Sequence, residues 1–276
     1  MAENKWQELF VGRTIPSRSF AVFGVNLTTG IEVGHNSNRL IEAASTIKVL
    51  VLAYLLSQVQ ARQCSLSNIE FVNELDRTNA GSGVLQWGTQ KSALELGLLA
   101  QLMILSSDNI ATNCLVRVFG VEAINDFARK LSLEHTRLVG PRLDFSTKTP
   151  EGIEMGVSTP VEMVRLMRKL VTGDLLNPDL TSFALGLLQG VTGSHFFRGI
   201  DIGQFKQSGS KTGWTYPDGD ICLGECGFMV NAEDQTAVFA VYSRLPSDPH
   251  LPYSIDALPR KMFGHVSRFV YDQLFL

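Results

Sequence analysis

The sequence predicts an α/β (α+β) fold in which an antiparallel sheet is flanked by helices and interrupted by an inserted all-helical domain. Two observations support this prediction. Strand-like runs occur near both ends of the 276-residue chain, and long apolar stretches with helical spacing fill the middle. Strands from the two ends are therefore expected to pair. This gives a discontinuous α/β domain, residues 1–44 with 202–276, and a helical domain, residues 45–201.

At the N-terminal end, residues 20–27 and 31–35 predict two strands joined by a Thr-Thr-Gly turn, which together make a hairpin. The pattern changes at Ala44. The apolar run that follows, ending near Ala61, is long enough for a buried helix. The chain is thus expected to pass directly from its first strands into the helical part.

In the middle of the chain, residues 92–131 predict helix, interrupted by polar residues at 106–109. Residues 140–158 predict a long irregular segment, and loops of that length in compact proteins are usually functional or disordered. Another helix is expected to begin after Thr159, a good N-cap, with Pro160 at the first helical position.

The C-terminal part predicts strands over residues 221–230 and 236–242, followed by an amphipathic helix over residues 255–274. Cys222 and Cys226 fall in the first of these strands, where their even spacing points both side chains to one face. The chain has four cysteines, and none shows the spacing of a metal-ligand pair. Reduced, buried thiols are therefore favoured over two disulfides.

Composition excludes several classes of partner. The net charge is −3, with 24 basic and 27 acidic residues and no basic block, so nucleic-acid binding is not expected. The apolar run at residues 49–56 is far shorter than the ~20 residues of a bilayer span. The first ten residues show no secretory signal, which predicts a cytoplasmic protein if the chain is full length and a periplasmic or secreted one if it is trimmed. The oligomeric state stays open.

Ser45-Thr46-Ile47-Lys48 places a hydroxyl and an amine on one face of a helical first turn. A serine hydroxyl is a weak nucleophile until a neighbouring base takes its proton. A lysine can act as that base if burial or another cation lowers its pKa. By itself the motif is weak, because the same spacing arises by chance at ordinary helix starts.

Two further short motifs follow, Ser107-Asp108-Asn109 and Lys211-Thr212-Gly213. Taken singly, the first indicates a loop or helix cap and the second a charged turn ahead of the late strands. Together and in this order, the three motifs resemble the set found in class A β-lactamases and penicillin-binding proteins. The resemblance implies the β-lactamase/transpeptidase-like fold and acyl transfer to a serine.

Three longer stretches extend the resemblance. Residues 107–115 resemble the family's helix after the second motif. Residues 136–138 resemble the entry to its Ω-shaped loop, and residues 167–176 resemble a helix beyond that loop. Order and spacing suit the family from about Phe20 to the C-terminus.

By this resemblance, Ser45 is the nucleophile that becomes acylated and Lys48 its general-base partner. Ser107 resembles the hydroxyl that carries a proton to the leaving group. The family places its oxyanion hole on two backbone N–H groups, which here are those of Ser45 and Trp214. Asp108 is expected to fix its loop rather than to take part in chemistry.

The remaining motif residues resemble the family's binding groups. Asn109 resembles the amide that holds the substrate's acyl-amide side chain. Lys211 and Thr212 resemble the pair that binds a substrate carboxylate, with Gly213 completing the motif. No metal or other cofactor is implied, and the five histidines have no metal-ligand spacing.

The sequence departs from the family at the base for deacylation. Class A enzymes carry Glu-x-x-Leu-Asn in the Ω loop, and residues 136–146 contain no such run. Forward alignment puts Arg142 at about that position. Asp144 is the nearest acid and is one methylene shorter, whereas Glu151 and Glu154 are interpreted as solvent-facing loop charges. We therefore expect an acyl-enzyme that forms normally and breaks down in an atypical way.

Other departures concern the binding site. The bulky Trp214 and Tyr216 are expected to reshape the edge of the pocket. Residues 220–227 lack the arginine that often assists carboxylate binding, so Arg198 either serves from the preceding segment or makes a surface salt bridge. Trp87 either walls the site or packs in the core.

Three hypotheses follow for a small-molecule substrate. The protein is a serine hydrolase of β-lactams or related amides and esters with unusual deacylation. Alternatively, it is a cytoplasmic amidase, esterase or transacylase of a specialised pathway. The third hypothesis is a non-catalytic penicillin-binding or sensor domain, which the presence of all three motifs disfavours.

Overall fold

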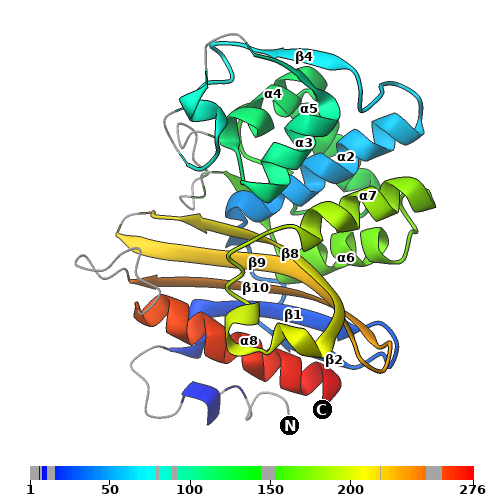
Figure 1. The fold of residues 1–276 in the computed structure, drawn as a ribbon. Helices are drawn as coiled ribbons and strands as arrows, with labels where there is room; N and C mark the ends of the chain where they lie inside the picture. Colours follow the sequence, from blue (N-terminus) through cyan, green and yellow to red (C-terminus); the bar gives the residue numbers. More distant parts are fainter. Residues whose placement is uncertain are drawn as a thin grey trace.

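A five-stranded antiparallel sheet forms the centre of the computed structural model (Figure 1). The structure describes residues 6, 8–10, 16–78, 81–88, 92–143, 149, 153, 155–217, 219–246 and 257–276. The strands lie in the order β2-β1-β10-β9-β8, with bounds β1 (Phe20–Asn26), β2 (Glu32–His35), β8 (Phe205–Thr215), β9 (Asp220–Asn231) and β10 (Thr236–Pro246). Strands from both ends of the chain pair, as predicted.

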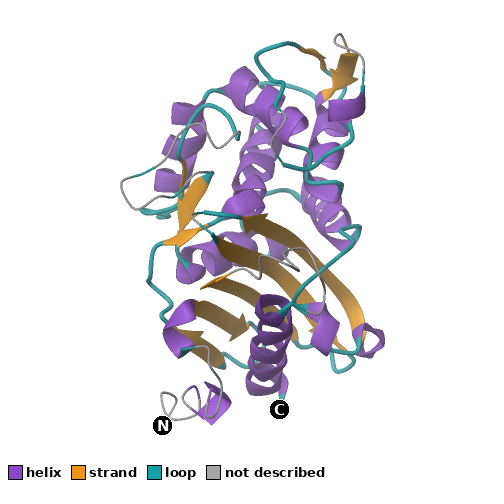
Figure 2. Ribbon diagram, turned by 90° about the vertical axis from the view of Figure 1, so that its left-hand side faces the viewer, coloured by secondary structure: helices purple, strands orange, loops and turns teal. Residues whose placement is uncertain are grey.

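Helices cover both faces of this sheet (Figures 1 and 2). One face carries α8 (Leu258–Phe275). The other faces the helices from the middle of the chain: α2 (Lys48–Gln60), α3 (Leu96–Leu105), α4 (Asn109–Phe119), α5 (Val121–Lys130), α6 (Pro160–Val171) and α7 (Pro178–Gln189). The fold is therefore the β-lactamase/transpeptidase-like one, and the exact domain boundaries stay a prediction.

Smaller elements connect the helices. Short strands form two further sheets, β3-β7-β6 and β4-β5, with bounds β3 (Ile41–Glu42), β4 (Ile69–Val72), β5 (Ser92–Glu95), β6 (Arg137–Leu138) and β7 (Gly156–Ser158). The 3₁₀ turns are η1 (Ser17–Ser19), η2 (Ala44–Ile47), η3 (Leu85–Trp87), η4 (Phe197–Gly199) and η5 (Ile202–Gln204). The inserted segment is thus mainly, but not purely, helical.

Two apolar cores lie on opposite sides of the sheet, and β10 contributes to both. Val238 and Ala240 belong to the core shared with α2, whereas Phe239 and Val241 belong to the core shared with α8. Successive side chains of a strand point to opposite faces, so a strand between two cores is apolar throughout. This explains why the late strands are continuous apolar runs in the sequence.

Several local predictions are confirmed. The Thr159 hydroxyl accepts a hydrogen bond from Glu162 N (3.2 Å), and Pro160 begins α6. The polar break near residue 107 separates α3 from α4. All four cysteines are free, and three of them are buried. Among the described residues, no helix is long and apolar enough to cross a membrane.

Three predictions are corrected. Residues at the start of the predicted 92–131 helix form β5, which pairs with β4. Residues 172–176 do not continue α6, because Gly173 adopts a left-handed conformation (φ 75°) that ends the helix. Lys211-Thr212-Gly213 lies inside β8 rather than in a turn. β8 was not recognised as a strand because it contains glycines and polar residues. It is an edge strand, and other parts of the backbone pack closely against its glycines.

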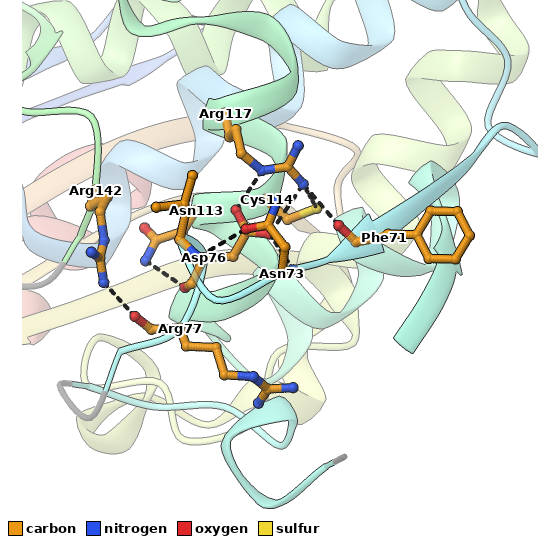
Figure 3. A network of polar contacts seen from close by, with 9 residues as sticks. Phe71, Asn73, Asp76, Arg77, Asn113, Cys114, Arg117 and Arg142 are labelled. Carbon is orange, nitrogen blue, oxygen red and sulfur yellow. Dashed lines mark hydrogen bonds and ion pairs between the residues drawn. The ribbon is translucent and has the colours of Figure 1, made fainter. Parts of the chain in front are cut away.

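A buried polar network ties the segment after β4 to α4 (Figure 3). The Asp76 carboxylate accepts hydrogen bonds from Arg117 Nε (2.7 Å) and Nη2 (3.1 Å) and from Asn73 N (2.9 Å). The Asp76 carbonyl accepts another from Asn113 Nδ2 (3.1 Å). This network therefore holds the segment after β4 against α4, the helix that begins at Asn109 of the second motif.

We expect Asp76→Ala to lower the free energy of unfolding by about 3 kcal/mol, because it removes one partner of a largely buried ion pair. Urea unfolding would measure the loss. The matched control is Asp126→Ala, which breaks an exposed pair with Arg129 and should cost less than about 1 kcal/mol. Equal losses in the two variants would contradict the assignment of Asp76 as a buried anchor.

Candidate active site

Ser45 lies in the 3₁₀ turn η2, which leads directly into α2, and only 9% of it is exposed. Its predecessor Ala44 has a φ of 47°, an uncommon conformation for a residue with a side chain. The turn is held by side chains on both sides. Glu42 Oε1 accepts from Ala44 N (2.9 Å), and the Thr46 hydroxyl hydrogen-bonds with Tyr242 OH (2.8 Å) on β10. The sheet therefore fixes the orientation of the serine.

Lys48, at the start of α2, is completely buried. Its Nζ donates to Ser107 O and to Asn109 Oδ1, both at 2.6 Å, and lies 3.1 Å from Ser107 Oγ. Burial, followed by the charge of Lys211, holds the pKa of Lys48 well below the ordinary lysine value. A neutral amine has two N–H groups, which the two short hydrogen bonds use, and one lone pair, which is left to accept a hydroxyl proton.

Ser107 links the two motif lysines. Its Oγ lies 3.1 Å from the Nζ of Lys48 and 3.1 Å from that of Lys211, and its backbone φ is 54°. The following residue, Asp108, caps α4 by accepting from Ala111 N (3.0 Å) and accepts from Leu85 N (2.8 Å). This agrees with the prediction that Asp108 fixes its loop.

Lys211, on β8, is also buried, and its Nζ donates to Thr212 O (2.9 Å) as well as to Ser107. Burial lowers the pKa of Lys211 to about 8, and Cys226 and Glu225 partly oppose this shift. Below that pH the group is an ammonium with three N–H donors, of which these contacts use two. The third is available to a bound anion.

At Gly213, β8 passes close to the turn η2, which carries Ser45. A Cβ added to Gly213 would lie 2.7 Å from Ser45 N and 3.0 Å from Thr46 N, so only glycine fits. Trp214, the next residue, is 37% exposed and packs edge-on against Tyr216, with ring centroids 5.6 Å apart. The structure thus brings the two proposed oxyanion donors, Ser45 and Trp214, onto adjoining backbone segments.

Gly213→Ala is expected to push β8 away from η2 and to slow reaction at Ser45 at least tenfold, because small displacements of reacting groups are costly. The rate of covalent labelling of Ser45 would measure this. The matched control is Gly186→Ala on α7, where an added Cβ meets nothing within 4 Å. Labelling of Gly213→Ala at the control rate would show that the close approach has no chemical importance.

A cavity of about 530 Å³ opens beside these residues, which is a suitable size for a small ligand. The residues around it are Ser45, Gly81, Ser82, Leu105, Ser106, Ser107, Asn109, Met155, Val191, Thr192, Lys211, Thr212, Gly213, Trp214, Thr215 and Tyr216. The motif residues supply its polar wall, and aromatic and aliphatic side chains supply the rest. No carboxylate is among the described residues that line it.

Two predicted site residues are not brought into this cavity, and a third lies outside the described residues. Trp87 on η3 is 84% exposed, so it neither lines the cavity nor packs in the core. Arg198 on η4 donates from Nε to Ser194 O (3.3 Å) and lines other surface hollows. Asp144 lies outside the described residues, as do the later loop acids Glu151 and Glu154.

The residue before Asp144 is placed precisely by two asparagines. Asn113 Oδ1 accepts from Leu143 N (2.8 Å), and Asn109 Nδ2 donates to Leu143 O (3.3 Å). Asn109 also accepts a hydrogen bond from Lys48. The single side chain of Asn109 therefore connects Leu143 to the buried amine of Lys48. Sequence reasoning missed Asn113, although its spacing of four residues from Asn109 on a helix was an available signal.

Comparison with known proteins agrees with this geometry. The family model described as "Beta-lactamase enzyme family" matches residues 3–274. The beta-lactamase SME-1 of Serratia marcescens is 26% identical over 198 residues, covering 68% of this chain and 62% of that protein. For the beta-lactamase OXY-2 of Klebsiella oxytoca the identity is 30% over 174 residues, covering 61% and 57%. The matches therefore span less than two thirds of these relatives.

Solved structures share the fold over nearly the whole chain. The beta-lactamase from Sphaerobacter thermophilus is similar with a TM-score of 0.79 and 23% identity, covering 97% of this chain and 94% of that one. PBP-A is similar with a TM-score of 0.79 and 22% identity, covering 98% and 96%. With the family model matched from residue 3 to residue 274, the chain belongs to the beta-lactamase enzyme family.

Proposed function

We propose that the protein is a serine hydrolase that acts on β-lactams or related amides and esters through an acyl-enzyme on Ser45. One observation carries this proposal: the Nζ of the buried Lys48 lies 3.1 Å from the hydroxyl of Ser107, and Ser107, Ser45 and Lys211 line the same cavity. A variant of PBP-A, which has the same fold, was solved as an acyl-enzyme complex with penicillin G. That relative supports the choice of a β-lactam as the first substrate to test.

In the proposed acylation, the Oγ of Ser45 attacks the substrate carbonyl carbon and its proton passes to the neutral Nζ of Lys48. The negative charge that develops on the carbonyl oxygen is stabilised by the N–H groups of Ser45 and Trp214. The amide C–N bond then breaks. Ser107 donates its proton to the leaving nitrogen and is reprotonated by Lys48.

Substrate binding is assigned to the groups that face the cavity. Lys211 and Thr212 would bind a substrate carboxylate, because the ammonium keeps one free N–H and the strand edge is open beside it. Asn109 would hold the substrate's acyl-amide group, as in the family. Trp214 and Tyr216 would favour an apolar or aromatic substituent at the rim. Trp87 and Arg198 have no part in this proposal.

Deacylation is proposed to be slow. A water molecule must be activated to attack the ester on Ser45, and the described residues of the cavity wall include no carboxylate to do so. Asp144 is the proposed base, since the neighbouring Leu143 is held against Asn109. An acyl group that persists on Ser45 can also pass to an amine or alcohol, which would make the protein a transacylase.

The function is tested by incubating the protein with a fluorescent penicillin and following its intact mass, alongside nitrocefin hydrolysis. A lasting adduct on Ser45 with little turnover is the expected result. The absence of any adduct would overturn β-lactam recognition, and rapid turnover would overturn slow deacylation.

Asp144→Asn is expected to slow breakdown of the adduct at least tenfold while leaving its formation unchanged, since removing a general base typically costs about 10²–10⁴-fold. The decay of the adduct mass after dilution gives the rate. Glu154→Gln, in the same loop, is the matched control and should decay like the parent protein. An unchanged rate in Asp144→Asn would remove this residue from the mechanism.

A further inference from the structure

Glu225, on β9, is a completely buried carboxylate that the proposed chemistry does not use. Its Oε2 accepts from the backbone N–H groups of His195 (2.6 Å) and Phe196 (2.8 Å). Its Oε1 accepts from the hydroxyls of Ser210 (2.6 Å) and Ser194. Burial raises the pKa of Glu225, and these four hydrogen bonds oppose that shift. Four donors on two oxygens are the arrangement that an ionised carboxylate requires.

Glu225 lies on β9, the strand that pairs with β8, and β8 carries Lys211. In the β8–β9 register, Thr212 is opposite Glu225 and Lys211 is opposite Cys226. Successive side chains of a strand point to opposite faces, so Ser210 turns toward Glu225 whereas Lys211 turns into the cavity. Both residues are buried and lie on paired strands, away from bulk water, where a charge acts over several ångströms, and Glu225 raises the pKa of Lys211 against the effect of burial.

Other groups near the site do not supply this negative charge. Besides Lys48 and Lys211 themselves, the titratable residues in this region are Asp108, His195, Cys226 and Glu225. Burial, with the nearby Arg260, lowers the pKa of His195 to about 3, so its ring is neutral. Burial raises the pKa of Cys226, which stays a thiol. Asp108 caps α4 and acts on Lys48. Cys226 and Glu225 both oppose the drop in the pKa of Lys211, and of the two only Glu225 has the four donors that an ionised group requires.

We propose that Glu225 is a positioning residue, whose buried charge keeps Lys211 an ammonium and so selects substrates that carry a carboxylate. Its hydrogen bonds also attach the segment at residues 194–196 to β8, directly after Val191 and Thr192 of the cavity wall. Glu225 itself does not touch the substrate. This inference rests on the proposed function, because it names the substrate class that the same cavity accepts.

Glu225→Gln tests the charge with little change in geometry. The amide oxygen can face the two N–H groups, and the hydroxyls of Ser194 and Ser210 can turn to accept from the amide NH₂. Removing the negative charge should lower the pKa of Lys211 by about one unit. Because the ammonium form binds the carboxylate, the loss of binding at high pH should then begin about one unit lower. At pH 8 the rate of acylation at low penicillin concentration should fall about fivefold, with little change at pH 6.

Nuclear magnetic resonance of ¹³Cε,¹⁵Nζ-labelled lysine gives the Lys211 titration directly, with the signal assigned by its loss in Lys211→Arg. The matched control is Glu162→Gln, since Glu162 is also buried and accepts from His135 N (3.1 Å) and the Thr136 hydroxyl (2.6 Å), but lies on α6. It should leave the Lys211 titration unchanged. An unshifted Lys211 titration in Glu225→Gln would overturn the proposal even if activity drops.

Two measurements separate this inference from the proposed function and from misfolding. If penicillin forms no adduct with the parent protein, the proposed function fails, while the lysine titration still tests the role of Glu225. If Glu225→Gln does not fold, the ¹³Cδ shift of Glu225 in the parent protein decides. An ionised carboxylate through pH 6–9 supports the proposal, and a protonated one overturns it.

Discussion

Ser45→Ala is expected to abolish covalent labelling by a fluorescent penicillin completely, because it removes the only atom on which the proposed acyl group forms. The backbone around residue 45 should persist, since Glu42 and Tyr242 hold the turn through Ala44 and Thr46. Intact mass spectrometry after extended incubation gives the result directly.

The matched control for this variant is Ser57→Ala, a serine on α2, the helix that follows the turn of Ser45, whose Oγ donates to Tyr54 O (2.7 Å). It should label at the parent rate. An adduct of unchanged mass and rate on Ser45→Ala would mean that another residue is the nucleophile, and the assignment of the first motif would be wrong.

The second large effect is expected at Lys48. Lys48→Met should lower the acylation rate by about 10²–10⁴-fold, the usual contribution of a general base. Lys48→Arg should be impaired to a similar degree, because a guanidinium carries charge but cannot accept a proton. Stopped-flow labelling would give both rates, with Lys130→Met on the exposed end of α5 as the control.

The pH dependence gives an independent check on Lys48. Burial lowers its pKa, so the neutral base persists to lower pH than for an ordinary lysine, and acylation should decline as acid protonates it. The decline at high pH should come from Lys211, whose pKa is about 8, as its ammonium loses a proton. A rate that rises steadily up to pH 10 would contradict both assignments. Activity of Lys48→Arg near that of the parent protein would contradict the assignment of Lys48 alone.

The chemical residues were predictable because short local patterns carry them. Ser45 and Lys48 share one helical turn, and Ser107 precedes a helix that Asp108 caps, so each pair is set by its nearest neighbours. The hairpin of β1 and β2 and the start of α6 at Pro160 were predictable for the same reason. Order along the chain then joined the separate motifs into one site.

What could not be predicted depends on contacts between distant segments. The sequence around Lys211 and Gly213 indicates a turn, because the strand has glycine where the backbone of η2 approaches it. In the sequence, Glu225 looks like any charged residue of a strand. Its role depends on four hydrogen-bond donors from two other segments, which meet only in the folded protein. Trp87 was a candidate for a wall of the site or for the core because it precedes the second motif, yet the structure leaves it exposed on η3.

The order of strands in the sheet has a consequence for synthesis of the protein. The strand that carries Lys211 is joined to β1 only through β9 and β10, and β10 is the last of the five strands to be made. While the chain is still emerging from the ribosome, Ser45 and Lys48 exist, but the strand that completes their pocket has no sheet to join. A nascent chain should therefore remain unreactive until residue 246 has left the exit tunnel, so that reaction with penicillin reports completed folding.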